Sequence, residues 1–132
     1  MAAMTQEPIE MILLRHWASY VAMPIWLADP AGDLIYYNEP AESLLGGRFE
    51  DAREIPAEEL AEIFVTTDLD GAPIPSSELP LVVALTDHVP AHRVLRFRAL
   101  DGSSRVIEVL AIPIEGQGGR HLGAMATFWE PI

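Results

Sequence analysis

Residues able to carry out nucleophilic, redox or metal chemistry are few in this chain. Cysteine is absent, which removes disulfides, thiolate metal sites and cysteine nucleophiles. The histidines are His16, His88, His92 and His121, and no two of them have the spacing of a zinc site, so we predict no metal site. His88, just after a predicted helix, is the one candidate for an axial haem ligand. Against this role, a solitary histidine is more often a surface or helix-end residue.

Acid–base catalysis has little support either. Ser76 and Ser77 lack the Gly-x-Ser-x-Gly turn of a nucleophilic serine, and no glycine-rich phosphate loop occurs. Neighbouring carboxylates such as Glu58 and Glu59 fit the solvated face of a helix. A small enzyme would need an acid–base pair inside its core, and the residues that we expect to point inward include no carboxylate or histidine. We predict that the chain is not an enzyme.

The charge balance narrows the range of partners. Lysine is absent, and 20 acidic residues stand against 8 arginines, giving a formal net charge of -12. Such a surface repels phosphate backbones and anionic lipid headgroups. No apolar run approaches the length of a membrane span, and the N-terminus lacks the features of a secretory signal. We predict a cytoplasmic protein with no nucleic-acid and no membrane partner.

The first element is predicted to be a helix from Glu7 to Val21, because apolar residues recur there at helical spacing and Pro24 blocks its continuation. The apolar positions are Ile9, Ile12, Leu13, Trp17, Tyr20 and Val21. This helix either covers part of its own domain or packs against a second copy. We divide the chain into an N-terminal amphipathic helix, residues 1–22, and a globular domain, residues 23–132.

Short strands and helices follow through the middle of the chain. The predicted elements are a strand pair, Pro24–Ala28 and Leu34–Asn38, a helix over Pro40–Leu45 capped by Asn38, short helical pieces within Phe49–Phe64, and a longer helix that begins at Ser76 or Ser77 and ends near Thr86. The segment Asp29-Pro30-Ala31-Gly32-Asp33 supplies the turn residues that join the strand pair into a hairpin.

The C-terminal third is predicted to be an antiparallel meander. Its strands are His92–Leu100, Ser104–Ile114 and His121–Trp129. With a three-residue turn at Asp101-Gly102-Ser103, Arg96 would face Glu108 on the solvated side of the sheet. The complete set predicts an α+β fold: a five-stranded antiparallel sheet with short helices on one face and the N-terminal amphipathic helix covering the other.

This order of elements and its turn motifs resemble the PAS family. The motif Asp29-Pro30-Ala31-Gly32-Asp33-Leu34-Ile35-Tyr36-Tyr37-Asn38 is similar to the opening hairpin, and Asp70-Gly71-Ala72-Pro73-Ile74-Pro75 with Glu78-Leu79-Pro80-Leu81 to the approach and long helix of many bacterial members. The ordered series covers about residues 22 to 130. The resemblance implies a bacterial cytoplasmic signalling domain that holds a small molecule or a partner in a cup between sheet and helices.

The resemblance raises the question of a cofactor. Light-sensing flavin members form a photoadduct with a cysteine, and the absence of cysteine excludes that chemistry here. Haem on His88 and non-covalent flavin are not favoured by the residues present. The cofactor therefore stays unknown.

The cup, if open, should be lined by apolar side chains with Tyr36 as a polar handle. The expected lining is Trp26, Tyr36, Phe64, Leu81, Leu85, Leu95, Phe97, Ile107, Val109, Ala126 and Phe128. Such a lining favours an aromatic or acyl ligand. The alternative is a closed core packed to normal density.

The basic residues Arg93, Arg96 and Arg98 cluster on one predicted strand. Arg96 and Arg98 share a strand face, where they either pair with acids such as Glu108 or form a docking patch for an acidic segment. Arg93 lies on the other alternation and could reach an anionic group at the rim of the cup.

Three functions remain open. In the first, a PAS-like sensor binds a small hydrophobic ligand in the cup and relays it through dimer or partner contacts. In the second, the chain is a ligand-free dimerisation module. A small cup-shaped enzyme is the third and least favoured. In the first two, a homodimer would use the N-terminal helix and the outer sheet face, at Ile9, Leu13, Trp17, Tyr20, Met125 and Trp129.

Overall fold

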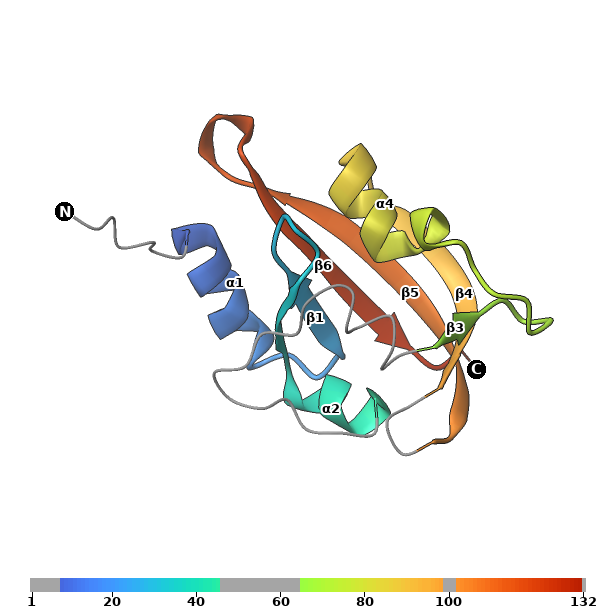
Figure 1. The fold of residues 1–132 in the computed structure, drawn as a ribbon. Coiled ribbons are helices and arrows are strands. Elements are labelled where there is room, and N and C mark those ends of the chain that lie inside the picture. Colours follow the sequence, from blue (N-terminus) through green and yellow to red (C-terminus); the bar gives the residue numbers. More distant parts are fainter. Residues whose placement is uncertain (1–7, 46–64, 99–101, 132) are drawn as a thin grey trace.

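The computed structural model describes residues 8–45, 65–98 and 102–131. Within these residues one curled antiparallel sheet carries helices on both faces (Figure 1). The helical pieces predicted within Phe49–Phe64, and with them the lining residue Phe64, lie outside the described residues. The α+β class predicted from the sequence is confirmed.

The elements follow the predicted order closely. In chain order they are α1 (Ile9–Ala18), β1 (Ile25–Ala28), β2 (Leu34–Tyr37), α2 (Glu39–Leu45), β3 (Thr66–Thr67), the 3-10 turn η1 (Ser76–Glu78), α4 (Pro80–Asp87), β4 (Ala91–Arg98), β5 (Ser104–Glu115), the 3-10 turn η2 (Gln117–Gly119) and β6 (His121–Trp129). The strands stand side by side in the order β2-β1-β6-β5-β4-β3. The first strand of the chain therefore lies beside the last one, because β1 pairs with β6.

The predicted hairpin between β1 and β2 forms through its own turn residues. The Asp29 Oδ1 atom accepts hydrogen bonds from the backbone N–H groups of Ala31 and Asp33, both at 3.0 Å. Gly32 has φ +90°, a value that favours glycine. The sequence of the turn therefore determines its geometry.

The Asn38 side chain, at the end of this hairpin, forms hydrogen bonds to three elements. Its Oδ1 atom accepts from the Ala41 N–H at 3.1 Å, the predicted helix cap, and also from the Ile25 N–H at 2.9 Å. Its Nδ2 group donates to the carbonyl oxygens of Ala18 at 3.0 Å and Met23 at 2.8 Å. A side chain that is 1% exposed thus satisfies backbone groups from the end of α1, the start of β1 and the first turn of α2.

Two predictions about the middle of the chain need correction. The sheet has six strands rather than five, because Thr66–Thr67 pairs with β4 as the short edge strand β3. The long helix begins at Pro80, with Leu79 as its N-cap and no side-chain cap, rather than at Ser76 or Ser77. Pro80 disfavours helical backbone angles at the residue before it, and Leu79 is extended, so the turn at η1 cannot continue into α4.

The predicted register between β4 and β5 was wrong by two residues. Arg96 lies opposite Val106 rather than Glu108, and Leu95 lies opposite Ile107. The paired residues Arg98 and Ser104 enclose five residues, 99 to 103, where the prediction assumed a three-residue turn. Since side chains alternate with a period of two, the error changed the partners but kept each residue on its predicted face.

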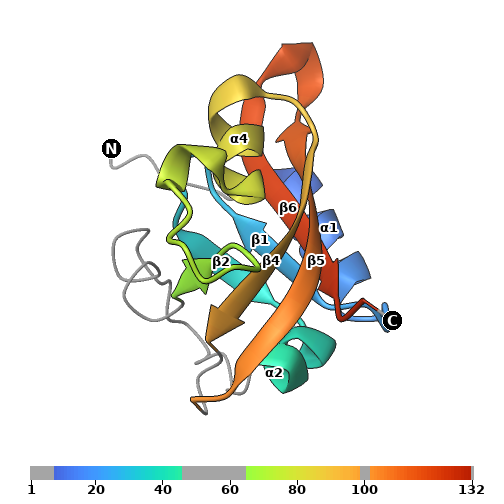
Figure 2. The same ribbon diagram turned by 90° about the vertical axis from the view of Figure 1, so that its right-hand side faces the viewer.

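The sheet has an inner face toward α4 and an outer face toward α1, as the two views show (Figures 1 and 2). The inner face holds the larger core cluster, which includes Leu95, Phe97 and Phe128 and is packed by residues of α4 and α2. A smaller cluster lies between α1 and the outer face, with Ala18, Ile25 and Leu27 fully or almost fully buried.

The prediction that the N-terminal helix covers the outer face holds only in part. Through Leu14 and Ala18, α1 packs on β1, β2 and the adjoining parts of β5 and β6. Farther across the sheet, Leu110 remains 36% exposed, and Val94 and Val106 are half-buried. A ten-residue helix is about 15 Å long, which is too short to cross a sheet of this width.

Candidate functional site

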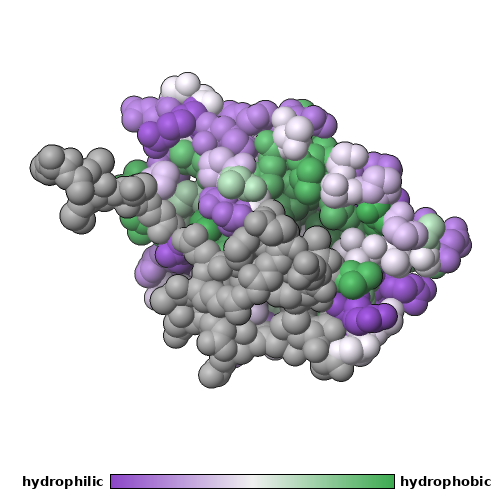
Figure 3. All heavy atoms as spheres, viewed as in Figure 1, coloured by the Kyte–Doolittle hydropathy of each residue, from purple (hydrophilic) through white to green (hydrophobic). Residues whose placement is uncertain are grey.

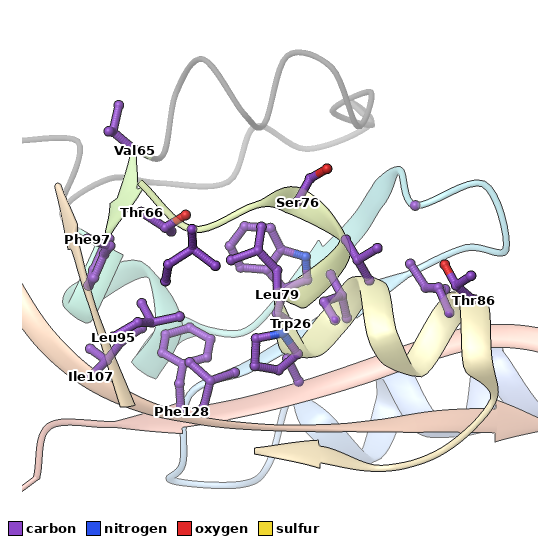
Figure 4. Close-up of a pocket in the computed structure, with 18 of the residues that line it drawn as sticks. Trp26, Val65, Thr66, Ser76, Leu79, Thr86, Leu95, Phe97, Ile107 and Phe128 are labelled. Atoms are coloured by element: carbon purple, nitrogen blue, oxygen red, sulfur yellow. The ribbon is translucent and has the colours of Figure 1, made fainter. Parts of the chain in front are cut away.

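A cavity of about 600 Å³ lies between the inner face of the sheet and α4. Strands β4, β5 and β6 form its floor, α4 and η1 form one wall, and the β1–β2 turn and β3 contribute at its edges (Figure 4). In the space-filling view hydrophobic residues gather around a hollow in the upper centre, next to polar residues (Figure 3). The volume lies in the range of cavities that hold small molecules.

Nine of the eleven residues predicted to line the cup do line this cavity. They are Trp26, Leu81, Leu85, Leu95, Phe97, Ile107, Val109, Ala126 and Phe128. Phe64 lies outside the described residues, and Tyr36 lies elsewhere. The structure brings the predicted set together around open space, so the inner face is not a fully closed core. That a ligand occupies it stays a prediction.

Tyr36 is on the wrong face to be the polar handle. It lies opposite Leu27 and belongs to the outer cluster under α1, where the Arg15 guanidinium is 5.9 Å from the ring centroid. Burial raises the pKa of the Tyr36 hydroxyl, partly offset by the charge of Arg15. An irregularity between Leu27 and Ala28 places both Leu34 and Tyr37 inward, which simple alternation along β2 did not show.

The chemistry of the lining is apolar below and polar at the rim. The floor residues Leu95, Phe97, Ile107, Val109, Ala126 and Phe128 are all buried. Hydroxyl groups come from Thr66, Ser76 and Thr86, and an indole N–H comes from Trp26. No charged side chain is among the described residues that line the cavity.

Sequence reasoning missed eleven lining residues, all of which lie in loops or at element ends except Val82, which is inside α4. They are Pro30, Ala31, Gly32, Val65, Thr66, Ile74, Ser76, Leu79, Pro80, Val82 and Thr86. The β-branched run Val65-Thr66-Thr67 was a signal for the edge strand β3, although three residues are too few to show alternation. Nothing in the sequence of the turn at Pro30–Gly32 predicts that it lines the same cavity as α4, since that placement depends on the curl of the sheet.

His88 does not reach the cavity and is not placed to ligate a haem there. It is the exposed C-cap of α4, with φ +57°, and its ring contacts that of His121 at a centroid distance of 4.2 Å. Within the described ranges, no group of three or more histidine, aspartate or glutamate side chains is arranged to hold a metal ion. The described lining also offers no histidine, tyrosine or methionine as an axial ligand.

The three clustered arginines lie on both faces of β4, because side chains alternate between the faces of a strand. Arg93 lies on the inner side of β4, where its Nη1 group is 3.5 Å from Glu78 Oε1 of η1. The predicted partner of Arg96, Glu108, instead binds His92, with Nε2 and Oε2 2.6 Å apart. This correction follows from the two-residue register shift between β4 and β5.

The six residues predicted for a dimer contact do not form one surface. Four of them point to solvent on α1 and just beyond it, since the helix ends at Ala18 rather than at the predicted Val21. Their exposed fractions are 66% for Ile9, 61% for Leu13, 49% for Trp17 and 78% for Tyr20, which lies in the turn after the helix. We call these four the α1 stripe. Met125 lies beneath α1 in the outer cluster, and Trp129 is half-buried near the end of β6, opposite Glu108.

Neither a protein-family model nor a curated protein matches the sequence, whereas solved structures do. A PAS domain from Colwellia psychrerythraea is 20% identical, with a TM-score of 0.63 over 92% of this chain and 97% of that one. The PAS domain of nitrogen regulation protein NR(II) from Vibrio parahaemolyticus is 17% identical, with a TM-score of 0.63 over 90% and 98%. The chain has the PAS fold.

A third PAS-fold structure resembles the chain over nearly its full length. The light-state dimer of the fungal blue-light photoreceptor Vivid is 14% identical, with a TM-score of 0.61 over 98% of this chain and 99% of that chain. The PAS resemblance carried by the sequence motifs is thus confirmed at the level of the fold. None of the described helices has the length and apolar composition required to cross a membrane.

Proposed function

We propose that the chain is a sensory domain that binds a small hydrophobic molecule in the cavity under α4. The observation that carries the proposal is a cavity of about 600 Å³ whose floor is apolar and buried. Leaving so much apolar surface without packing partners is costly in a protein core, and a hydrophobic ligand would supply the missing contacts. The PAS fold of structures that serve in nitrogen regulation and light reception supports a signalling role.

Helix α4 is the element through which occupancy would reach the surface. Leu81, Val82 and Leu85 of α4 line the cavity, and Ala84 of the same helix is fully buried. A ligand that packs against the first three would change the position or the mobility of α4 relative to the sheet. The proposal needs no catalytic group, in keeping with the absence of an acid–base pair from the described lining.

Native mass spectrometry of the purified protein tests the ligand. A stoichiometric extra mass that disappears on denaturation is the expected result. The variant Ala126→Trp should fill the cavity from its floor and abolish that mass, because Ala126 lies between Trp26 and Ala111 on neighbouring strands. Leu110→Trp adds bulk on the outer face and is the matched control. A bare polypeptide mass, with no small hydrophobic molecule bound on titration, would contradict the proposal.

The α1 stripe favours a second function, homodimerisation, either as the relay of the sensor or by itself. Ile9, Leu13 and Trp17 are spaced by four residues, so they line one side of the helix while Met11 and Ala18 face the sheet, and Tyr20 follows in the turn after the helix. A second copy offers the same stripe, and a two-fold contact would bury both. The light-state dimer of the similar photoreceptor Vivid supports dimerisation.

The mass of the protein in solution tests the dimer. Leu13→Glu places a charge in the centre of the stripe, so we expect it to convert a dimer to a monomer in light scattering. Ser19→Glu adds the same charge at an exposed residue just beyond the helix, off the stripe, and should keep the dimer. A wild-type monomer at high micromolar concentration, or a dimer that survives Leu13→Glu, would rule out this contact.

A further inference from the structure

We propose that the cavity is selective for an uncharged molecule with an apolar body and one hydrogen-bonding group, and that the Thr66 hydroxyl binds that group. This inference rests on the proposed ligand site and specifies what that site accepts. Three features of the described residues carry it: the absence of charge from the lining, the pairing of Arg93, and the position of Thr66.

An ionised ligand would find no counter-charge among the described residues that line the cavity. The described lining has no acidic or basic side chain, so a carboxylate or ammonium group drawn inside would lose its hydration without compensation. Arg93 lies two residues from Leu95 on the same side of β4, but its guanidinium faces Glu78. The net charge of -12 further repels anions.

Thr66 is placed to recognise a neutral polar group. It lies opposite Phe97 in the pairing of β3 with β4, so both side chains project from the same face of the sheet, toward the cavity. Figure 4 shows both at the same end of the cavity, close to where β3 forms its edge. The hydroxyl of the next residue, Thr67, donates to the Asp68 carbonyl at 3.0 Å, which leaves Thr66 as the β3 hydroxyl available to a ligand.

The other two hydroxyl groups of the lining are less well placed. Ser76 and Thr86 are exposed, and in Figure 4 the Ser76 hydroxyl points away from the cavity floor. Thr66 is only partly exposed, so a hydrogen bond to it is better shielded from water. The apolar body of the ligand would then lie over Ile107 and Phe128, with its polar end toward β3.

Four probes that share one aromatic body test the charge selectivity. They are naphthalene, 2-naphthalenemethanol, 2-naphthoate and 2-naphthylmethylammonium, titrated into the wild-type protein at neutral pH and followed by calorimetry. We expect the alcohol to bind best and each ion to bind at least about tenfold more weakly, because an ion loses hydration without gaining a partner. Binding of either ion as tight as that of the alcohol would overturn the inference and leave the proposed ligand site intact.

Thr66→Val tests the hydrogen bond, since it removes the hydroxyl and keeps the shape. The affinity for 2-naphthalenemethanol should fall about threefold to tenfold, whereas that for naphthalene should stay the same. Thr67→Val makes the same substitution at the next residue, which is not among the described residues that line the cavity, and this matched control should change neither affinity. An unchanged affinity of Thr66→Val for the alcohol would overturn the role of Thr66. Failure of all four probes to bind the wild-type protein would overturn both this inference and the proposed ligand site.

Discussion

The two faces of the sheet leave apolar surface unpacked in different ways. On the inner face, Leu95, Phe97 and Phe128 are each 3% exposed, yet a cavity remains above them, between the sheet and α4. On the outer face, α1 covers only one part, Leu110 stays exposed, and the helix itself turns its apolar stripe to solvent. A concave apolar cavity suits a small molecule, whereas an exposed apolar helix or sheet face suits another protein chain.

The largest effect should come from Asn38, where the two faces are joined. Asn38→Leu would leave the Ile25 and Ala41 N–H groups and the Ala18 and Met23 carbonyls without their partner. Each such buried group costs about 1 kcal/mol or more, so we expect a loss of about 4 kcal/mol in the free energy of unfolding, measured by urea denaturation. Asn38→Asp keeps the two accepted hydrogen bonds but replaces the amide donor with a carboxylate oxygen that faces the Ala18 and Met23 carbonyls, so its loss should also be large. A loss from Asn38→Leu of less than about 1 kcal/mol would show that the four bonds contribute little to stability.

A pair of truncations compares the faces directly. Phe128→Ala removes a buried inner ring that packs edge to face with Trp26, at a centroid distance of 6.5 Å, and should cost about 3 kcal/mol. Leu110→Ala on the outer face should cost less than about 1 kcal/mol, because that side chain is already partly in water. Chemical denaturation of both variants measures the difference. Similar costs would mean that the outer face is covered in solution, as a dimer would cover it.

The substitution Tyr36→Phe tests whether Tyr36 lies on the outer face of the sheet, and its expected effect is smaller. Because Tyr36 lies under α1 and not in the cavity, its hydroxyl should not contribute to binding of 2-naphthalenemethanol. The dissociation constant should stay within about twofold of the wild-type value, less than the loss of one hydrogen bond would cause. A tenfold loss of affinity would return Tyr36 to the role of polar handle.

The smallest effect concerns the start of α1, where a carboxylate holds the helix to the β5–β6 turn. Glu10 Oε2 accepts from the Gln117 N–H at 3.2 Å, and hydrogen bonds from its own backbone and from Gln117 lower the pKa of Glu10. A lowered pKa in the fold means that this link is intact above the ordinary glutamate value of about 4.3 and is lost as the pH falls through the lowered value. Amide exchange at Gln117 should accelerate over that range.

Glu10→Gln provides the control for the acid-sensitive link. The variant cannot titrate, so its Gln117 amide exchange should show no step in acid beyond the intrinsic pH dependence of exchange. A step of equal size in the variant would assign the effect to another group.

Local chemistry was sufficient to predict most elements and the inner residues. The Asp29–Asp33 turn, the Asn38 cap and the alternation of Leu95, Phe97, Ile107 and Val109 are all determined by neighbours in the chain. The predictions were wrong where the structure depends on contacts between residues far apart in the chain. The β4–β5 register depended on the length of the connecting turn, and the face of Tyr36 depended on an irregularity in the β1–β2 pairing.

The PAS fold and the apolar character of the inner face could be predicted from the sequence, because periodicity and turn chemistry act over a few residues. That a cavity lies over this face, with Thr66 at its rim, became known from the three-dimensional structure. The structure also shows that α1 packs through Met11 and Ala18 and leaves Leu13 and Trp17 in water. These outcomes depend on the curl of the sheet and on which side of each helix packs against it. Both are set by contacts between residues far apart in the chain.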